Sequence, residues 1–175
     1  GANIEAVMRL HAVKTEILQR TRYLGRHGAA NLARRMLQAA DGSGPVGANG
    51  SKLTVLVGHD TNIGDLSGLL GFYWHVPSFP PDDPPPGGGV GLEVLRDAAG
   101  VRYVRAFYQS QTMDQMRELT PLDFVTPAFR QYLTIPGCRL GGDPTICTLA
   151  QFERVVRAQL PPAAESRHPE QELPK

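Results

Sequence analysis

A short apolar run followed at once by a histidine and an aspartate is the part of this sequence best suited to chemistry. Residues 53–57 read Leu-Thr-Val-Leu-Val, and residues 58–62 read Gly-His-Asp-Thr-Asn. The apolar run predicts a strand buried on both faces, the type found inside α/β sheets. A helix is expected to follow directly, with Thr61 or Asn62 as its cap.

This strand-to-helix junction is a favourable place for an anion. Ligands of open α/β sheets bind beyond the carboxyl ends of strands, and the N-terminus of a helix attracts negative charge. His59 can donate hydrogen bonds to phosphate oxygens, and Asp60 can pass a proton to a leaving oxygen. The pair therefore fits cleavage of a phosphate ester, although a His-Asp pair after a strand is more often structural than catalytic.

The remaining pattern alternates helices and strands. Residues 77–89 are too rich in proline and glycine for regular structure, so they form either a surface loop or the rim of a site. A turn at 97–100 predicts an antiparallel hairpin of two strands. The expected helices are 4–21, 29–40, a short one within 112–119, and a last one that opens with a capping box at 148–151 and ends at Pro161-Pro162.

Size and charge exclude several classes. The 175 residues suffice for one domain, expected over 1–160 with a polar, disordered tail at 161–175. A formal net charge of +1 argues against a nucleic-acid binder, and no apolar run is long enough for a membrane span. No histidines have metal-ligand spacing, so no metal site is expected. The first residues resemble neither a signal peptide nor a usual start, so the chain is expected to be cut from a longer one.

Two cysteines flank a predicted turn. Cys138 and Cys147 enclose residues 139–146, which contain Gly-Gly and Asp-Pro. A disulfide closing this turn would imply an oxidising compartment, whereas the other reading is two unrelated thiols. The spacing alone leaves both readings open.

Residues 53–70 resemble the C-terminal signature of the histidine acid phosphatases, above all the bacterial periplasmic phytases and glucose-1-phosphatases. The resemblance extends from residue 53 to residue 152, and the first 52 residues match only in helical character. It is carried, beyond residues 53–70, by Pro-Pro-Gly-Gly at 85–88, Gly-Leu-Glu-Val at 91–94, Gln-Thr-Met-Asp-Gln-Met-Arg at 111–117, Thr-Pro-Leu at 120–122, Gly-Cys at 137–138, Cys-Thr-Leu at 147–149 and Phe152.

The resemblance implies a two-step hydrolysis of phosphomonoesters without metal or cofactor. A histidine in an Arg-His-Gly-x-Arg-x-Pro motif attacks phosphorus, and water then releases phosphate. By the same resemblance His59 contacts the phosphate, Asp60 protonates the leaving alcohol, and Thr61 lines the pocket. It also implies a disulfide between Cys138 and Cys147 and a periplasmic or secreted enzyme.

The nucleophile motif itself is expected to lie outside this chain. Arg26-His27-Gly28 begins like it but continues Ala-Ala-Asn-Leu, follows a helix instead of a buried strand, and is interpreted as a surface loop. The fold expected is therefore α/β, part of a layered α/β/α phosphatase domain with a mixed sheet. An N-terminal portion of the same enzyme would supply central strands, phosphate-binding arginines and the nucleophile. The substrate stays open among phytate, sugar phosphates and similar esters, and the rival interpretation is a non-catalytic phosphate-ester-binding or scaffolding module.

Overall fold

The computed structural model describes residues 2–43 and 51–162. The predicted tail falls almost wholly on residues 163–175, outside the described residues. The elements in chain order are α1 (Ala2–Leu18), α2 (Arg22–Gly28), α3 (Ala30–Asp41), α4 (Asp60–Leu70), β1 (Gly89–Arg96), β2 (Arg102–Ser110), α5 (Met113–Arg117), β3 (Phe129–Tyr132), β4 (Ile146–Thr148) and α6 (Leu149–Gln159).

The sheet is built on the predicted hairpin. β1 and β2 pair antiparallel along their whole length, and Asp97 closes their turn by accepting the Val101 N–H at 2.9 Å. β3 and β4 both pair antiparallel with the other edge of β2, β3 toward its C-terminal end and β4 nearer its start. β2 is therefore the central strand of the described sheet.

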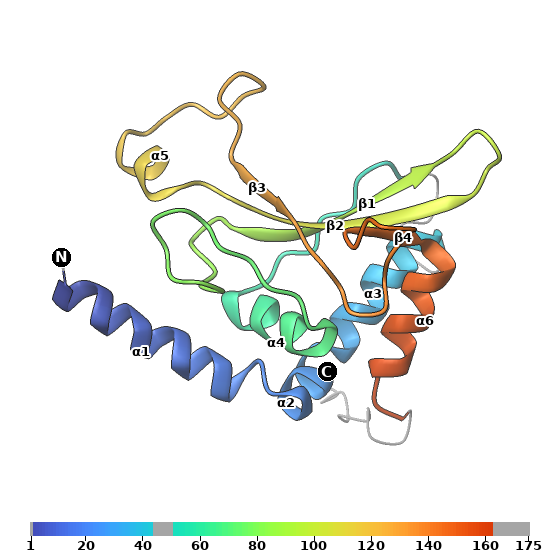
Figure 1. Cartoon of the computed structure of the whole chain (residues 1–175), viewed down its shortest axis with the longest axis horizontal. Helices are drawn as coiled ribbons and strands as arrows, with labels where there is room; N and C mark the ends of the chain where they lie inside the picture. Colours follow the sequence, from blue (N-terminus) through green and yellow to red (C-terminus); the bar gives the residue numbers. More distant parts are fainter. Residues whose placement is uncertain (1, 44–50, 163–175) are drawn as a thin grey trace, which may run out of the picture.

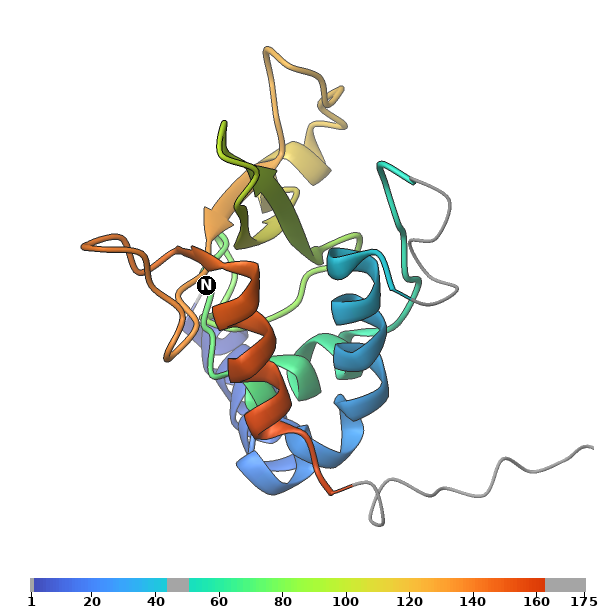
Figure 2. The same cartoon turned by 90° about the vertical axis from the view of Figure 1, so that its right-hand side faces the viewer.

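Three helices cover one face of this sheet. Figures 1 and 2 show α3, α4 and α6 beneath the strands, with α3 and α6 side by side. Alternate residues of β2, namely Val104, Ala106 and Tyr108, are buried toward that layer, as the two-residue period of a strand requires. The α/β class is thus confirmed, and the described residues supply antiparallel strands with one helical layer.

Aromatic stacking joins the sheet to the segment after α4. The indole of Trp74 lies parallel to the Tyr108 ring at 4.7 Å between centroids, and both side chains are almost fully buried. The Trp74 Nε1–H donates to the carbonyl of Asp83 at 2.9 Å. This contact holds the proline-rich loop against the core.

The capping box predicted for the last helix is half formed. Thr148 Oγ1 accepts the Gln151 N–H at 3.2 Å, as expected, but the Gln151 side chain donates to the Gly137 carbonyl at 2.8 Å. Gln151 therefore links α6 to the turn before the disulfide. Phe152 and Val156 bury the predicted apolar face.

The apolar face of α1 points away from the rest of the described chain, whereas that of an ordinary amphipathic helix faces the core. Val7, Ile17 and Leu18 are all more than half exposed. The polar His11 instead contacts Asp83, and the side chain of Thr15 is buried. α1 also ends at Leu18 instead of continuing to residue 21, and α2 forms where a loop was predicted. An apolar stripe facing water lacks a partner, which the described residues do not supply.

The predicted buried strand at 53–57 is not formed. These residues belong to no strand among those described, and Leu53, Val55 and Val57 are 77%, 70% and 96% exposed. The cause is physical: a strand needs neighbours on both edges for its backbone groups. The described part of the chain places none beside it.

The disulfide is present, and its removal should cost stability. Cys138 and Cys147 are bonded and both lie in the core. Replacing both by alanine is expected to lower the free energy of unfolding by about 2 to 3 kcal/mol, because the nine-residue closure no longer restricts the unfolded chain. Urea unfolding of the oxidised chain, the reduced chain and the variant checks this. Equal stability of all three would contradict it.

Candidate active site

The start of α4 holds the His-Asp pair. His59 is the extended residue that precedes the helix, and Asp60 is its first residue. The N-cap residue is His59, and not Thr61 or Asn62 as predicted. Asn62 takes part from the third position of the helix, where its Oδ1 accepts the His59 N–H at 2.9 Å. Asp60 Oδ1 accepts the Thr61 N–H at 2.8 Å. Gly58 allows this turn, since a Cβ there would meet Asn62 Oδ1 at 2.8 Å.

The three predicted site residues are exposed, and two of them share a cavity. His59 and Asp60 line the edge of a hollow of about 1390 Å³, while Thr61 does not belong to its lining. The structure therefore brings His59 and Asp60 together at one opening. It leaves Thr61 on the outer side of the same turn.

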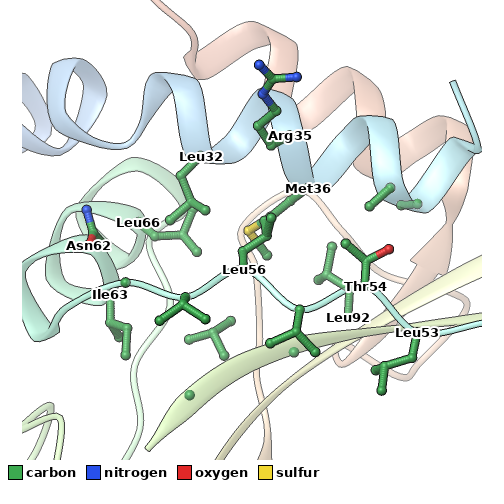
Figure 3. Close-up of a pocket in the computed structure, with 18 of the residues that line it drawn as sticks. Leu32, Arg35, Met36, Leu53, Thr54, Leu56, Asn62, Ile63, Leu66 and Leu92 are labelled. Atoms are coloured by element: carbon green, nitrogen blue, oxygen red, sulfur yellow. The ribbon is translucent and has the colours of Figure 1, made fainter. Parts of the chain in front are cut away.

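The cavity is a gap in a hydrophobic core more than a ligand pocket. It exceeds the roughly 300 to 1,000 Å³ of usual small-molecule sites. Figure 3 shows residues 53–57 running alone between α3 and β1, with apolar side chains from all three around the space. Those labelled there include Leu32, Met36, Leu56, Leu66 and Leu92. Secondary structure absent from the described residues would fill this space, and the His-Asp pair sits at its end.

The proline-rich loop forms another side of the same opening. Residues 84–88 line the cavity together with His59 and Asp60. The loop thus belongs to the rim of the site, the second of the two readings that its composition allowed.

Metal ligands and membrane helices are not found in the described part. Over residues 2–43 and 51–162, no group of three or more His, Cys, Asp or Glu side chains is placed to hold a metal ion. Within the same ranges no helix combines the length and apolar character needed to cross a bilayer.

Comparisons with known proteins agree on one group of enzymes. No family model matches the chain. Phytase AppA of Escherichia coli strain K12 is 33% identical over 163 residues, which cover 90% of this chain and 38% of that protein. The structure of the phytase from Citrobacter braakii superposes with a TM-score of 0.77 at 28% identity, over 89% of this chain and 40% of that one.

The phytase of Hafnia alvei, solved in complex with tartrate, gives a TM-score of 0.79 at 33% identity, over 89% of this chain and 39% of that one. The same phytase is also solved with myo-inositol hexakis sulphate. This chain is homologous to the C-terminal part of bacterial phytases. It spans about two fifths of their length, which agrees with the gaps in its sheet and core.

Residues Arg26 and His27 of the Arg-His-Gly triplet contact neighbouring groups of the same chain. Arg26 and His27 lie in the last turn of α2, where Arg26 donates to the Leu160 carbonyl at 2.9 Å and His27 rests against Tyr23. The predicted surface loop is therefore a helix. That His27 is not the nucleophile stays a prediction, consistent with its place outside the cavity lining.

Sequence reasoning missed the surroundings of three acidic residues that lie close to the elements of the site without lining the cavity. Asp83 contacts His11 of α1, and Asp82 pairs with Arg20 between α1 and α2. Both pairs span more than 60 residues of sequence, so no local pattern predicts them. Asp65, one turn into α4, lies against the backbone of Gly28, and burial raises its pKa to about 6. Its sequence spacing of five from Asp60 places the two carboxyls on different faces of α4, so no sequence pattern indicated it.

Asp65 should make the chain less stable as pH rises. A carboxyl whose pKa is raised from about 3.9 in the unfolded chain stabilises the fold most when protonated, and this contribution is lost as pH rises through about 6. Asp65→Asn is expected to be about 1 kcal/mol more stable than wild type at pH 7.5, a value discounted for solvent exposure, and equal at pH 4.

Urea unfolding at both pH values measures this difference. Glu118→Gln, at an exposed position of similar charge, serves as the control and should change neither value. A wild-type advantage at pH 7.5 would show that Asp65 has a favourable partner and would contradict the expectation.

Proposed function

We propose that this chain supplies the proton-donor half of a phosphomonoester hydrolase of the histidine acid phosphatase type. The supporting observation is the position of His59 and Asp60 at the open end of an incomplete core, in a chain homologous to phytases. A proton donor at this open end of the core would face the elements that complete the core. The rest of the site therefore comes from the portion that corresponds to the other three fifths of a phytase.

The proposed reaction has two steps. A histidine of the N-terminal portion attacks phosphorus, a P–N bond forms, and the P–O bond to the alcohol breaks. Asp60 gives its proton to the departing oxygen, while His59 donates a hydrogen bond to a phosphate oxygen. Water then attacks the phosphohistidine and releases phosphate, with its proton returning to Asp60. The step balances without a metal or a cofactor.

The proposed substrate class is phosphate esters of polyols or sugars, phytate included. The Hafnia alvei homologue binds myo-inositol hexakis sulphate, a polyanion whose sulphates stand in for phosphates. Such a ligand needs several cations. Neither His59 nor Asp60 provides a fixed positive charge, so the proposal assigns the phosphate-binding arginines to the N-terminal portion.

The proposed partner is that N-terminal portion. The exposed run 53–57, the apolar stripe of α1 and the large cavity all lack covering groups among the described residues. The disulfide between Cys138 and Cys147 fits an oxidising compartment, so we place the assembled enzyme in the periplasm or outside the cell.

Hydrolysis of p-nitrophenyl phosphate at mildly acidic pH tests the proposal. The 175-residue chain alone should show no turnover, and the chain assembled with its N-terminal portion should be active. In the assembled enzyme Asp60→Asn is expected to lower kcat by about 10²- to 10⁴-fold, with a small change in ligand binding, because it removes general acid catalysis.

One control variant and two contrary outcomes complete this test. Asp114→Asn changes an exposed aspartate at the start of α5 and should leave kcat unchanged. An assembled wild type that binds phosphate esters without turnover would instead identify a binding or scaffolding module. Turnover by the chain alone that His27→Ala abolishes would overturn the assignment of the nucleophile.

A further inference from the structure

The cavity beside residues 53–57 has two chemically different ends. At one end this run leads into His59 and Asp60. At the other end, named the distal end below, the end of β1 and the start of β2 meet the end of α3, where Arg102 Nη1 donates to the Asp41 carbonyl at 2.9 Å. Figure 3 shows the apolar side chains of the cavity walls between the two ends.

The distal end is lined by three cationic side chains, which belong to Lys52, Arg96 and Arg102. Arg96 and Arg102 lie directly opposite each other on β1 and β2. Like charges in opposite positions of an antiparallel pair destabilise a sheet. Arg35 also lines the cavity, but its guanidinium points away from the space in Figure 3. The positive charge of the cavity is therefore concentrated at the distal end.

The described residues supply little negative charge to these three cations. None of the three forms an ion pair within the part of the chain that the structure describes. Among the same residues Asp41 is the one carboxylate that lines the distal end, and its Oδ1 accepts the Ser43 N–H at 2.6 Å. The other carboxylate of the lining is that of Asp60, at the opposite end.

An occupant of this cavity has to match both its middle and its distal end. The middle is lined by side chains such as Leu32, Met36 and Leu92, so an apolar segment would remove that surface from water. At the distal end a carboxylate would meet cations beside a protein wall, where charges interact more strongly than in bulk water. Complementary charge of this kind fixes the register of a partner more than it adds affinity.

We propose that the segment of the N-terminal portion that fills this cavity is apolar along its length and carries a carboxylate at the distal end. The carboxylate pairs with Lys52 and Arg96. The identity of the partner rests on the proposed function, whereas the charge of the distal end is a property of this chain. The ion pair sets the register of the segment along residues 53–57, and this register decides which of its groups lie beside Asp60.

Zero-length cross-linking of the assembled enzyme with a water-soluble carbodiimide tests the proposal. The reagent activates a carboxylate, the Lys52 amine attacks the acyl carbon, an amide forms and the carbodiimide leaves as its urea. Lys52 is a selective reporter, because the other lysines of the chain are Lys14 on α1 and Lys175 at the last position. Mass spectrometry of the digested product is expected to find Lys52 joined to an aspartate or glutamate of the N-terminal portion.

A variant and a change of salt separate an ion pair from mere proximity. Arg96→Gln removes a neighbouring charge and adds no carboxylate, so it is expected to lower the yield of this product about threefold. About 0.5 M NaCl should lower the yield of the wild type similarly, and this measurement serves if Arg96→Gln does not fold. Arg139→Gln changes an exposed cation outside the cavity lining and should leave the yield unchanged. A yield that neither Arg96→Gln nor salt lowers would overturn the proposal.

The partner of Lys52 in the product decides between occupants. Products only with Asp41, with the glutamates of residues 163–175 or with a second copy of this chain would overturn the proposal. An active assembled enzyme without any Lys52 product would overturn it too, and would leave the proposed function standing. An assembled protein that gives the expected product but shows no effect of Asp60→Asn would overturn the proposed function alone.

Discussion

The unpaired backbone of residues 53–57 is the constraint on which the rest of the structure depends. Each residue of a strand carries a donor and an acceptor that must be satisfied, and an apolar strand also needs cover on both faces. Among the described residues the Leu53 carbonyl accepts a hydrogen bond from Ser51 Oγ, but no strand pairs with this run, and Val57 is 96% exposed. The cavity beside this run is open for the same reason.

That constraint explains why the candidate site lies at a boundary. Gly58 alone separates the unpaired run from His59 and Asp60. The elements that would complete the strand would therefore also lie next to the proposed proton donor. The hairpin, α6 and the disulfide pack within the described residues, through the buried Phe152 and the Trp74–Tyr108 stack. The chain therefore combines a packed core with an open edge that carries the proposed chemistry.

Local patterns predicted the elements whose partners lie nearby. The β1–β2 hairpin and α6 followed from a turn, an alternation and a cap, and the pairing of Cys138 with Cys147 followed from family resemblance. The strand at 53–57 was predicted wrongly, because its pairing depends on neighbours absent from the described residues. The exposure of the apolar side chains of α1 does not follow from their helical spacing. The contact of His11 with Asp83 spans 72 residues and leaves no periodic signal.

Hydrogen exchange at the backbone amides of residues 53–57, in the chain alone and after assembly with the N-terminal portion, tests the central claim most directly. The account predicts almost no protection in the chain alone and at least about a hundredfold protection after assembly, since pairing on both edges removes these amides from water. Strong protection in the chain alone would contradict the account. So would an assembled, active enzyme in which these amides still exchange freely.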